Sequence, residues 1–250
     1  MHRFWEIDFL RGIAIIMMLL YHGYFDFIFF RNYSGNFAIY LFGRATGILF
    51  ILLVGISLTL SYSRAKKERT ANFCKYFKRG IKIFSIGLLI SALTFVLFPK
   101  YFIIFGILHF IGISVILGYF FVALNTIALA LGILLIFLGL YLSNYTFNFW
   151  WFLWLGLIPE NFQSFDYYPL LPYFGFVLIG ISIGNFFYPD YRRRFKLPEI
   201  SNKFAKFVCW LGRNSLKIYL IHQPIIVALF LIFGLIDLQS LLNFSQFSGF

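Results

Sequence analysis

The sequence consists mainly of long apolar runs separated by short polar or proline-containing breaks. Each run has about the 20 residues that a helix needs to cross the hydrocarbon core of a bilayer. Only helices and closed barrels satisfy every backbone polar group in lipid, and these runs are continuous rather than alternating. They therefore predict an all-α transmembrane bundle of about seven spans, at residues 8–30, 38–62, 80–98, 102–123, 126–143, 169–187 and 213–235.

The composition agrees with a lipid environment. Of the 250 residues, 61% are hydrophobic and 12% are charged, which is too apolar for a surface exposed to water. We therefore expect a single membrane-embedded domain over residues 1–250, in the cell membrane and with multiple passes. The two cysteines, Cys74 and Cys209, belong to no CxxC or Cys/His pattern, so the sequence predicts neither a disulfide nor a metal site.

Lysine and arginine predict the orientation of the chain. They are concentrated in residues 64–82 and 192–206, and such clusters stay preferentially on the cytoplasmic side. The N-terminus is then inside and the C-terminus outside. Attraction to anionic lipid headgroups accounts for the net charge of +12, so membrane lipids are expected partners and nucleic acid is not. The outer segment 144–168 has no Lys or Arg and is rich in aromatic residues, which indicates an interfacial belt or, alternatively, a lid or sugar-stacking platform.

The first run carries four ionisable residues, Asp8, Arg11, His22 and Asp26. An ionisable side chain within a span costs roughly 2.5–3.5 kcal/mol, so such residues usually mark a site or an internal pair. Arg11 and His22 are close to three helical turns apart and share one stripe, about 16 Å apart along the axis. His22 lies near Asp26, where a carboxylate could orient its ring as a base. The alternatives are an interhelical hydrogen bond for His22 and an anchor paired to Asp8 for Arg11.

Two further histidines, His109 and His222, also lie within apolar runs. With His22 they could converge on one polar cavity. Pro224 follows His222 by two residues and would free a backbone carbonyl, which predicts a broken helix that lines such a cavity, while Gln223 adds an amide.

Arg213 and Asn214 lie at the inner mouth of the last run. They could present donors to an anionic ligand, or Asn214 could simply cap a helix. The sequence has no GxxxxGK, GxGxxG, HExxH or GxSxG pattern, so nucleotide hydrolysis, Rossmann binding, zinc proteolysis and the usual serine hydrolysis have no support.

Four segments taken together resemble one known family. In chain order, they resemble the heparan-alpha-glucosaminide N-acetyltransferase catalytic-domain family, within the wider transmembrane acyltransferase group. Arg11 and His22, with ten residues between them, are also similar to a pattern in related membrane sugar O-acyltransferases. The four segments are RFWEIDFLRGIAIIMMLLYHGYFDF from residue 3, ILLVGISLTL from residue 51, FGILHFIG from residue 105 and LGRNSLKIYLIHQP from residue 211.

The resemblance implies acyl transfer across a membrane. Acetyl-CoA or another acyl-CoA would approach from the cytoplasm, and a sugar or lipid-linked glycan would accept the acyl group outside. The lysosomal members carry extra spans and a large luminal region absent here, so heparan itself is not the expected acceptor. The implied catalytic set is His22 as base, Asp26 orienting its ring, and His109 and His222 shaping or polarising the site. The expected cofactor end comprises Asp8, Arg11, Arg213 and Asn214.

Two other function classes remain open at this point. A proton-coupled transporter or flippase would use the same intramembrane His and Asp residues as a proton relay. A structural subunit of a larger membrane complex would use them only for packing.

Overall fold

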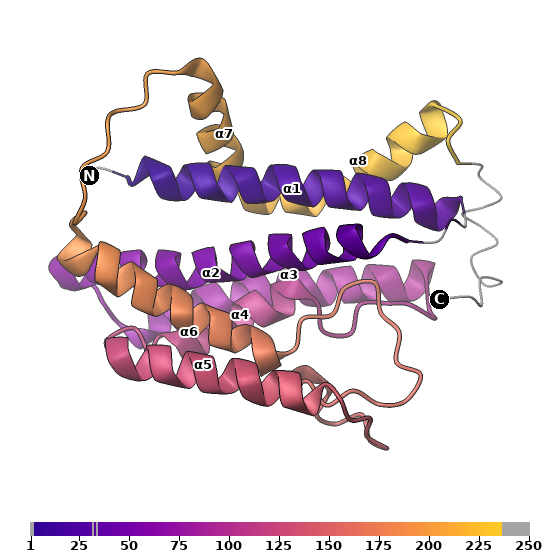
Figure 1. The fold of residues 1–250 in the computed structure, drawn as a ribbon, viewed down its shortest axis with the longest axis horizontal. Coiled ribbons are helices and arrows are strands. Elements are labelled where there is room, and N and C mark those ends of the chain that lie inside the picture. Colours follow the sequence, from indigo (N-terminus) through magenta and orange to yellow (C-terminus); the bar gives the residue numbers. More distant parts are fainter. Residues whose placement is uncertain (1–2, 32, 34, 237–250) are drawn as a thin grey trace. The chain divides into compact units, whose positions relative to one another are not determined.

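The computed structural model describes residues 3–31, 33 and 35–236, and within these ranges the fold is helical, without a β-strand (Figure 1). Two short 3-10 turns, η1 (Leu153–Leu155) and η2 (Pro189–Tyr191), interrupt the loops. The α-helices are α1 (Trp5–Phe30), α2 (Phe37–Lys67), α3 (Phe73–Leu97), α4 (Ile107–Gly118), α5 (Asn125–Leu142), α6 (Leu170–Phe187), α7 (Lys203–Arg213) and α8 (Ser215–Ile232).

Six of the described helices, α1, α2, α3, α5, α6 and α8, are long and apolar enough to cross a membrane. Their positions confirm the prediction of a polytopic helical membrane protein. The predicted run 102–123 forms the shorter helix α4, whose 12 residues extend about 18 Å against a hydrocarbon core of about 30 Å. This predicted span, the fourth along the chain, is therefore a partial helix flanked by irregular chain.

Helix α4 begins at Ile107, five residues after the start of the predicted run, because a loop holds the chain that precedes it. The Asp166 carboxylate accepts the backbone N–H of Ile107 at 2.9 Å, at the first turn of α4. Gly106 makes this approach possible, because a Cβ there would lie 2.4 Å from the Asp166 oxygen. The carbonyls of Tyr101 and Phe105 accept hydrogen bonds from the same loop, so the irregular segment before α4 keeps its backbone groups paired.

By its internal contacts the described chain divides into two compact units. The terminal unit combines residues 1–50 with residues from 197 onward, and the central unit comprises residues 51–196. Helix α2 begins in the first and ends in the second. The expectation of a single membrane domain stays a prediction.

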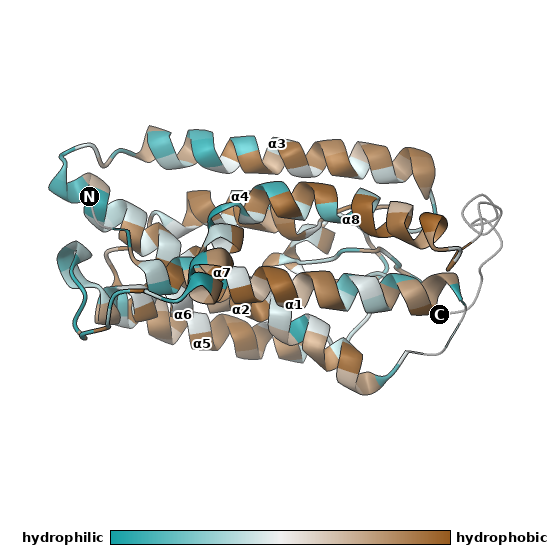
Figure 2. Cartoon of the chain, turned by 90° about the horizontal axis from the view of Figure 1, so that it is seen from above, coloured by the Kyte–Doolittle hydropathy of each residue, from teal (hydrophilic) through white to brown (hydrophobic). Residues whose placement is uncertain are grey.

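The central unit is built on two helix pairs, α3 with α4 and α5 with α6, and α4 also contacts α6. Its core is formed by fully buried apolar side chains. The end of α2, the start of α3 and the end of α6 lie at the same end of this unit, where hydrophilic residues are concentrated (Figures 1 and 2). The basic segment 64–82 and the chain that follows α6, up to residue 196, therefore lie at one end of this unit. The core residues include Ile51, Leu58, Phe110, Val177, Leu178 and Ile181.

The terminal unit contains a helix that the sequence analysis missed. Helix α7 lies against the first turns of α1 at a steep angle to it (Figure 1). The two backbones touch: a Cβ at Gly12 would lie 2.0 Å from the Val208 carbonyl oxygen, and one at Gly212 would lie 1.8 Å from the Asp8 carbonyl oxygen. The helical period that could have revealed α7 is carried by the apolar positions Phe204, Phe207, Val208 and Leu211, with Lys203 before them and Lys206 among them.

Candidate active site

The predicted stripe on the first helix exists. Asp8, Arg11, His22 and Asp26 all lie on the uninterrupted 26-residue helix α1. Asp8 and Asp26 are buried, whereas Arg11 and His22 are partly exposed. Helix α8 lies beside α1 within the terminal unit and brings a second set of polar side chains to the stripe.

Two imidazole rings meet between α1 and α8. The ring centroids of His22 and His222 are 4.8 Å apart, with an angle of 58° between the ring planes. Gln223, the next residue on α8, places its amide nitrogen 2.9 Å from Nδ1 of His22. Tyr21 closes one side, with its ring edge-on to the His22 ring at 5.3 Å. The structure therefore brings together two of the three histidines that the sequence analysis singled out.

Asp26 is connected to this pair through a third side chain. Gln223 hydrogen-bonds the Asp26 carboxyl group as well as the His22 ring. The expected direct contact between the Asp26 carboxylate and the His22 imidazole is thus replaced by an amide bridge from α8. An arrangement that depends on a neighbouring helix could not be inferred from the spacing of two residues on α1.

The ring of His222 is held by a hydrogen bond to a backbone carbonyl of its own helix, α8. Its Nδ1 is hydrogen-bonded to the Tyr219 carbonyl oxygen, which can only accept, so Nδ1 carries the proton. The side chain is 6% exposed, and its Nε2 has no hydrogen-bond partner within the described residues. Asp26 Oδ2 is likewise buried and without a partner there. The expected break at Pro224 is wrong, because α8 continues as a helix through that residue.

His109 belongs to the central unit and has a local environment of its own. Its Nδ1 accepts the N–H of Gly106 at 3.2 Å, and its Nε2 lies 3.4 Å from the Ser91 hydroxyl. The rings of Phe84 and Phe105 cover it. One ring nitrogen therefore serves the first turn of α4 and the other faces Ser91 on α3. The convergence of His109 with the other two histidines stays a prediction.

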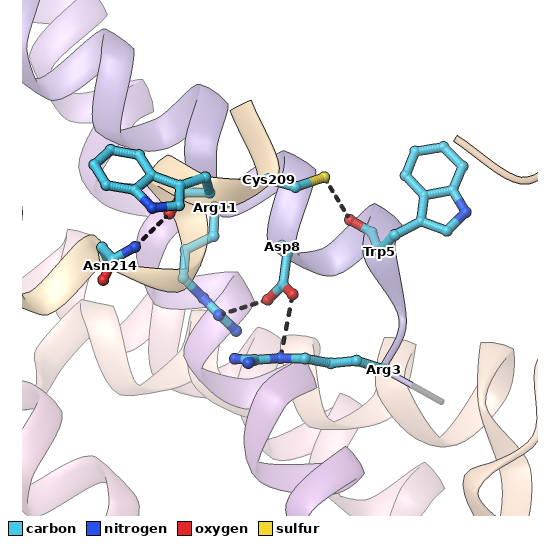
Figure 3. Close-up of polar contacts among 7 residues, drawn as sticks. Arg3, Trp5, Asp8, Arg11, Cys209 and Asn214 are labelled. Carbon is cyan, nitrogen blue, oxygen red and sulfur yellow. Dashed lines mark hydrogen bonds and ion pairs between the residues drawn. The ribbon is translucent and has the colours of Figure 1, made fainter. Parts of the chain in front are cut away.

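An ion-pair cluster lies near the start of α1 (Figure 3). The Asp8 carboxylate binds Arg11 at 3.2 Å through one oxygen and Arg3 at 3.2 Å through the other. Arg11 thus has the partner that the anchor interpretation requires. Asn214 donates to the Trp210 carbonyl at 2.9 Å and ends α7, but its side chain makes no capping hydrogen bond to α8, the helix that the capping alternative concerned. Arg213 is exposed. Arg3, which precedes the apolar run, was not foreseen as a member of this cluster.

The two cysteines are expected to differ in reactivity. Cys209 is buried beside the Trp5 carbonyl (Figure 3), whereas Cys74 is exposed. Burial, and next the negative charge of Asp8, raise the pKa of the Cys209 thiol, so less of the reactive thiolate forms at neutral pH. In detergent, maleimide should label Cys74 well before Cys209, and labelling of Cys209 should rise only above the ordinary thiol range. Equal rates in the folded protein would contradict this, and equal labelling in SDS is the control.

Comparison with protein families gives one match, to the family described as heparan-alpha-glucosaminide N-acetyltransferase, catalytic, over residues 3–224. The chain belongs to this family. The acetyltransferase match starts just before α1 and ends at Pro224, and so includes both histidines of the pair and Gln223. No curated protein and no solved structure matches the chain. Membership in this acetyltransferase family makes the chain a membrane acyltransferase.

Proposed function

We propose that the chain transfers an acetyl or other acyl group from cytoplasmic acyl-CoA to a sugar or lipid-linked glycan outside. The reacting centre is the pair His22 and His222. The observation that carries this proposal is the contact of two imidazoles from separate helices, at 4.8 Å, with one buried ring nitrogen left without a partner in the described chain. The family supplies the reaction class.

The chemistry of acyl transfer matches what such a pair can do. The acceptor hydroxyl or amine must lose a proton, and the thioester carbonyl oxygen gains negative charge as the bond to the acceptor forms. A positioned base contributes typically 10²–10⁴-fold to such a reaction. A hydrogen-bond donor aimed at the developing oxyanion, in a site that excludes water, contributes a comparable amount. Two adjacent imidazoles with different proton positions can supply both functions.

The acyl donor would reach this centre from the inner end of α1. Arg11 lies three turns below His22, or about 16 Å along the axis. Its guanidinium and that of Arg3 hold Asp8, while Arg213 and Lys217 are exposed at the junction of α7 and α8. These two exposed cations suit the phosphates of CoA. The extended pantetheine arm would then carry the thioester toward the histidine pair.

Acetyl-CoA should stabilise the purified protein against heat. A ligand that binds only the folded state adds about 2.7 kcal/mol at a concentration of 100 times its Kd. The measurement is the melting temperature in detergent with acetyl-CoA, with ATP as a control for phosphate charge alone. Arg213→Gln should reduce the shift without lowering the melting temperature of the unliganded protein.

If no acyl-CoA raises the melting temperature, the proton-coupled transporter becomes the favoured function. The hydrogen-bonded series from Asp26 through Gln223 to His22 is the observation that favours that second function. Proton flux into liposomes that contain the protein, without any acyl-CoA, would support it.

A further inference from the structure

The two histidines of the pair carry their protons on different ring nitrogens. Nδ1 of His22 faces the amide nitrogen of Gln223, which can only donate, so Nδ1 accepts and the neutral ring has its proton on Nε2. His222 is the opposite case. Its Nδ1 donates to the Tyr219 carbonyl, which leaves the lone pair on Nε2.

Asp26 fixes the direction of the Gln223 amide. When the Asp26 carboxyl group is ionised, an amide turned over would place its oxygen against the carboxylate, and the two acceptors would repel each other. Because Gln223 hydrogen-bonds the Asp26 carboxyl group, its NH₂ group is the one directed at both Asp26 and His22. The chain Asp26, Gln223, His22 thus determines which nitrogen of His22 can donate.

The lone pair of His222 is one of two unused acceptors in this arrangement, the other being Asp26 Oδ2, and it is the one on an imidazole ring. Its Nε2 is buried, the side chain is only 6% exposed, and the described part of the chain offers that nitrogen no hydrogen-bond donor. A buried acceptor without a partner costs free energy, typically 1–3 kcal/mol. A substrate that brings an O–H or N–H group to this nitrogen would recover it.

We propose that His222 is the base that takes the proton of the acceptor, and that His22 donates a hydrogen bond from Nε2 to the thioester carbonyl oxygen. This inference rests on the proposed acyltransferase function and reverses the expected role of His22. The identity of the base follows from the two proton positions, and Asp26 and Gln223 are positioning residues that act through His22.

The proton and the acyl group then move between named atoms. Nε2 of His222 removes the proton from the acceptor O–H or N–H, and the acceptor atom bonds to the thioester carbon. Negative charge on the carbonyl oxygen is met by the Nε2–H of His22. As the carbonyl re-forms, the C–S bond breaks and the CoA sulfur takes the proton back from His222, which releases the acylated acceptor and CoA thiol.

Matched amide variants separate the two roles. A glutamine places its amide nitrogen where Nε2 of a histidine lies, and an asparagine places its amide where Nδ1 lies. His22→Gln keeps an N–H donor at the position of Nε2 and should retain activity within about tenfold, while His22→Asn should lose more. His222→Asn keeps the donor to the Tyr219 carbonyl but has no base, and should lose roughly 10²–10⁴-fold, as should His222→Gln. The assay is CoA release from acetyl-CoA with glucosamine as acceptor.

A second acceptor tests the base without relying on the fold of one variant. Hydroxylamine is small, strongly nucleophilic and unprotonated at neutral pH, so its attack needs no prior loss of a proton. With hydroxylamine, His222→Asn should regain most of the wild-type rate of hydroxamate formation, whereas His22→Asn should stay slow. A structural defect at either position would slow both acceptors equally.

The outcomes distinguish this inference from the function on which it rests. Wild-type protein that releases no CoA with either acceptor would overturn the acyltransferase proposal. Active wild-type protein with the reversed pattern, in which His22→Gln is as slow as His22→Asn and hydroxylamine rescues the His22 variants, would make His22 the base. Rescue confined to the His222 variants, with melting temperatures near that of the wild type, is the result we expect.

Discussion

Alanine at both His22 and His222 is expected to abolish acyl transfer and leave a protein that still inserts and folds. The base alone accounts for typically 10²–10⁴-fold of the rate. Because the two rings meet at 4.8 Å and act in the same step, the losses should not multiply, and the double variant should be little slower than the worse single variant. The measurement is CoA release from acetyl-CoA by all three variants in detergent.

The control for this series is Leu20→Ala, on the same helix. Leu20 is 64% exposed, and we expect its truncation to leave activity near that of the wild type. Losses that multiply across the two histidines would mean that they act in separate steps. Activity retained by the double variant would remove the pair from the mechanism altogether.

Gly12→Ala is expected to cause one of the two largest losses of stability of any glycine-to-alanine substitution in the terminal unit, the other being Gly212→Ala. Its Cβ would lie 2.0 Å from the carbonyl oxygen of Val208, a backbone atom that cannot rotate away. Overpacking usually costs about 1–3 kcal/mol, and a contact with backbone belongs at the upper end. For a chain of this size about 3 kcal/mol corresponds to a melting temperature about 6–12 °C lower.

Gly23→Ala is the matched control, since it makes the same substitution on the same helix. A Cβ at Gly23 meets nothing within 4 Å, and alanine gains about 0.5–1 kcal/mol over glycine in a helix. The melting temperature should stay the same or rise slightly. If both variants melt at the same temperature, α7 does not depend on close contact with α1.

The long helices and the polar side chains that α1 contributes to the site could be predicted because their sequence signals are local. The length of the apolar runs predicted the long helices. One stripe of α1 was predicted from the spacing of Asp8, Arg11, His22 and Asp26 along one run. The ion pair between Asp8 and Arg11 follows from a separation of three residues, at which helical side chains meet.

The part of the site that α8 contributes depends on contacts between residues far apart in sequence. Gln223 and His22 are 201 residues apart, and the sequence contains no signal that an amide on one helix will bridge a carboxyl and an imidazole on another. The proton position of His22, and hence the role proposed for it, depends on that contact, whereas the proton position of His222 is set by the Tyr219 carbonyl on its own helix. The length of α4 was missed for a similar reason, since Asp166 sets where it begins.

The contact between α7 and α1 holds the chain immediately before α8. Gly12 precedes His22 by ten residues, and Gly212 precedes His222 by ten residues, so the glycine contact and the imidazole contact are equally spaced on the two segments. The close backbone contact at the two glycines anchors the chain near the start of α8. A slip of one residue along α8 would turn a side chain by about 100°, and the His222 ring would point away from His22. Two residues without side chains thus anchor the segment from which α8 leads to the proposed reacting pair.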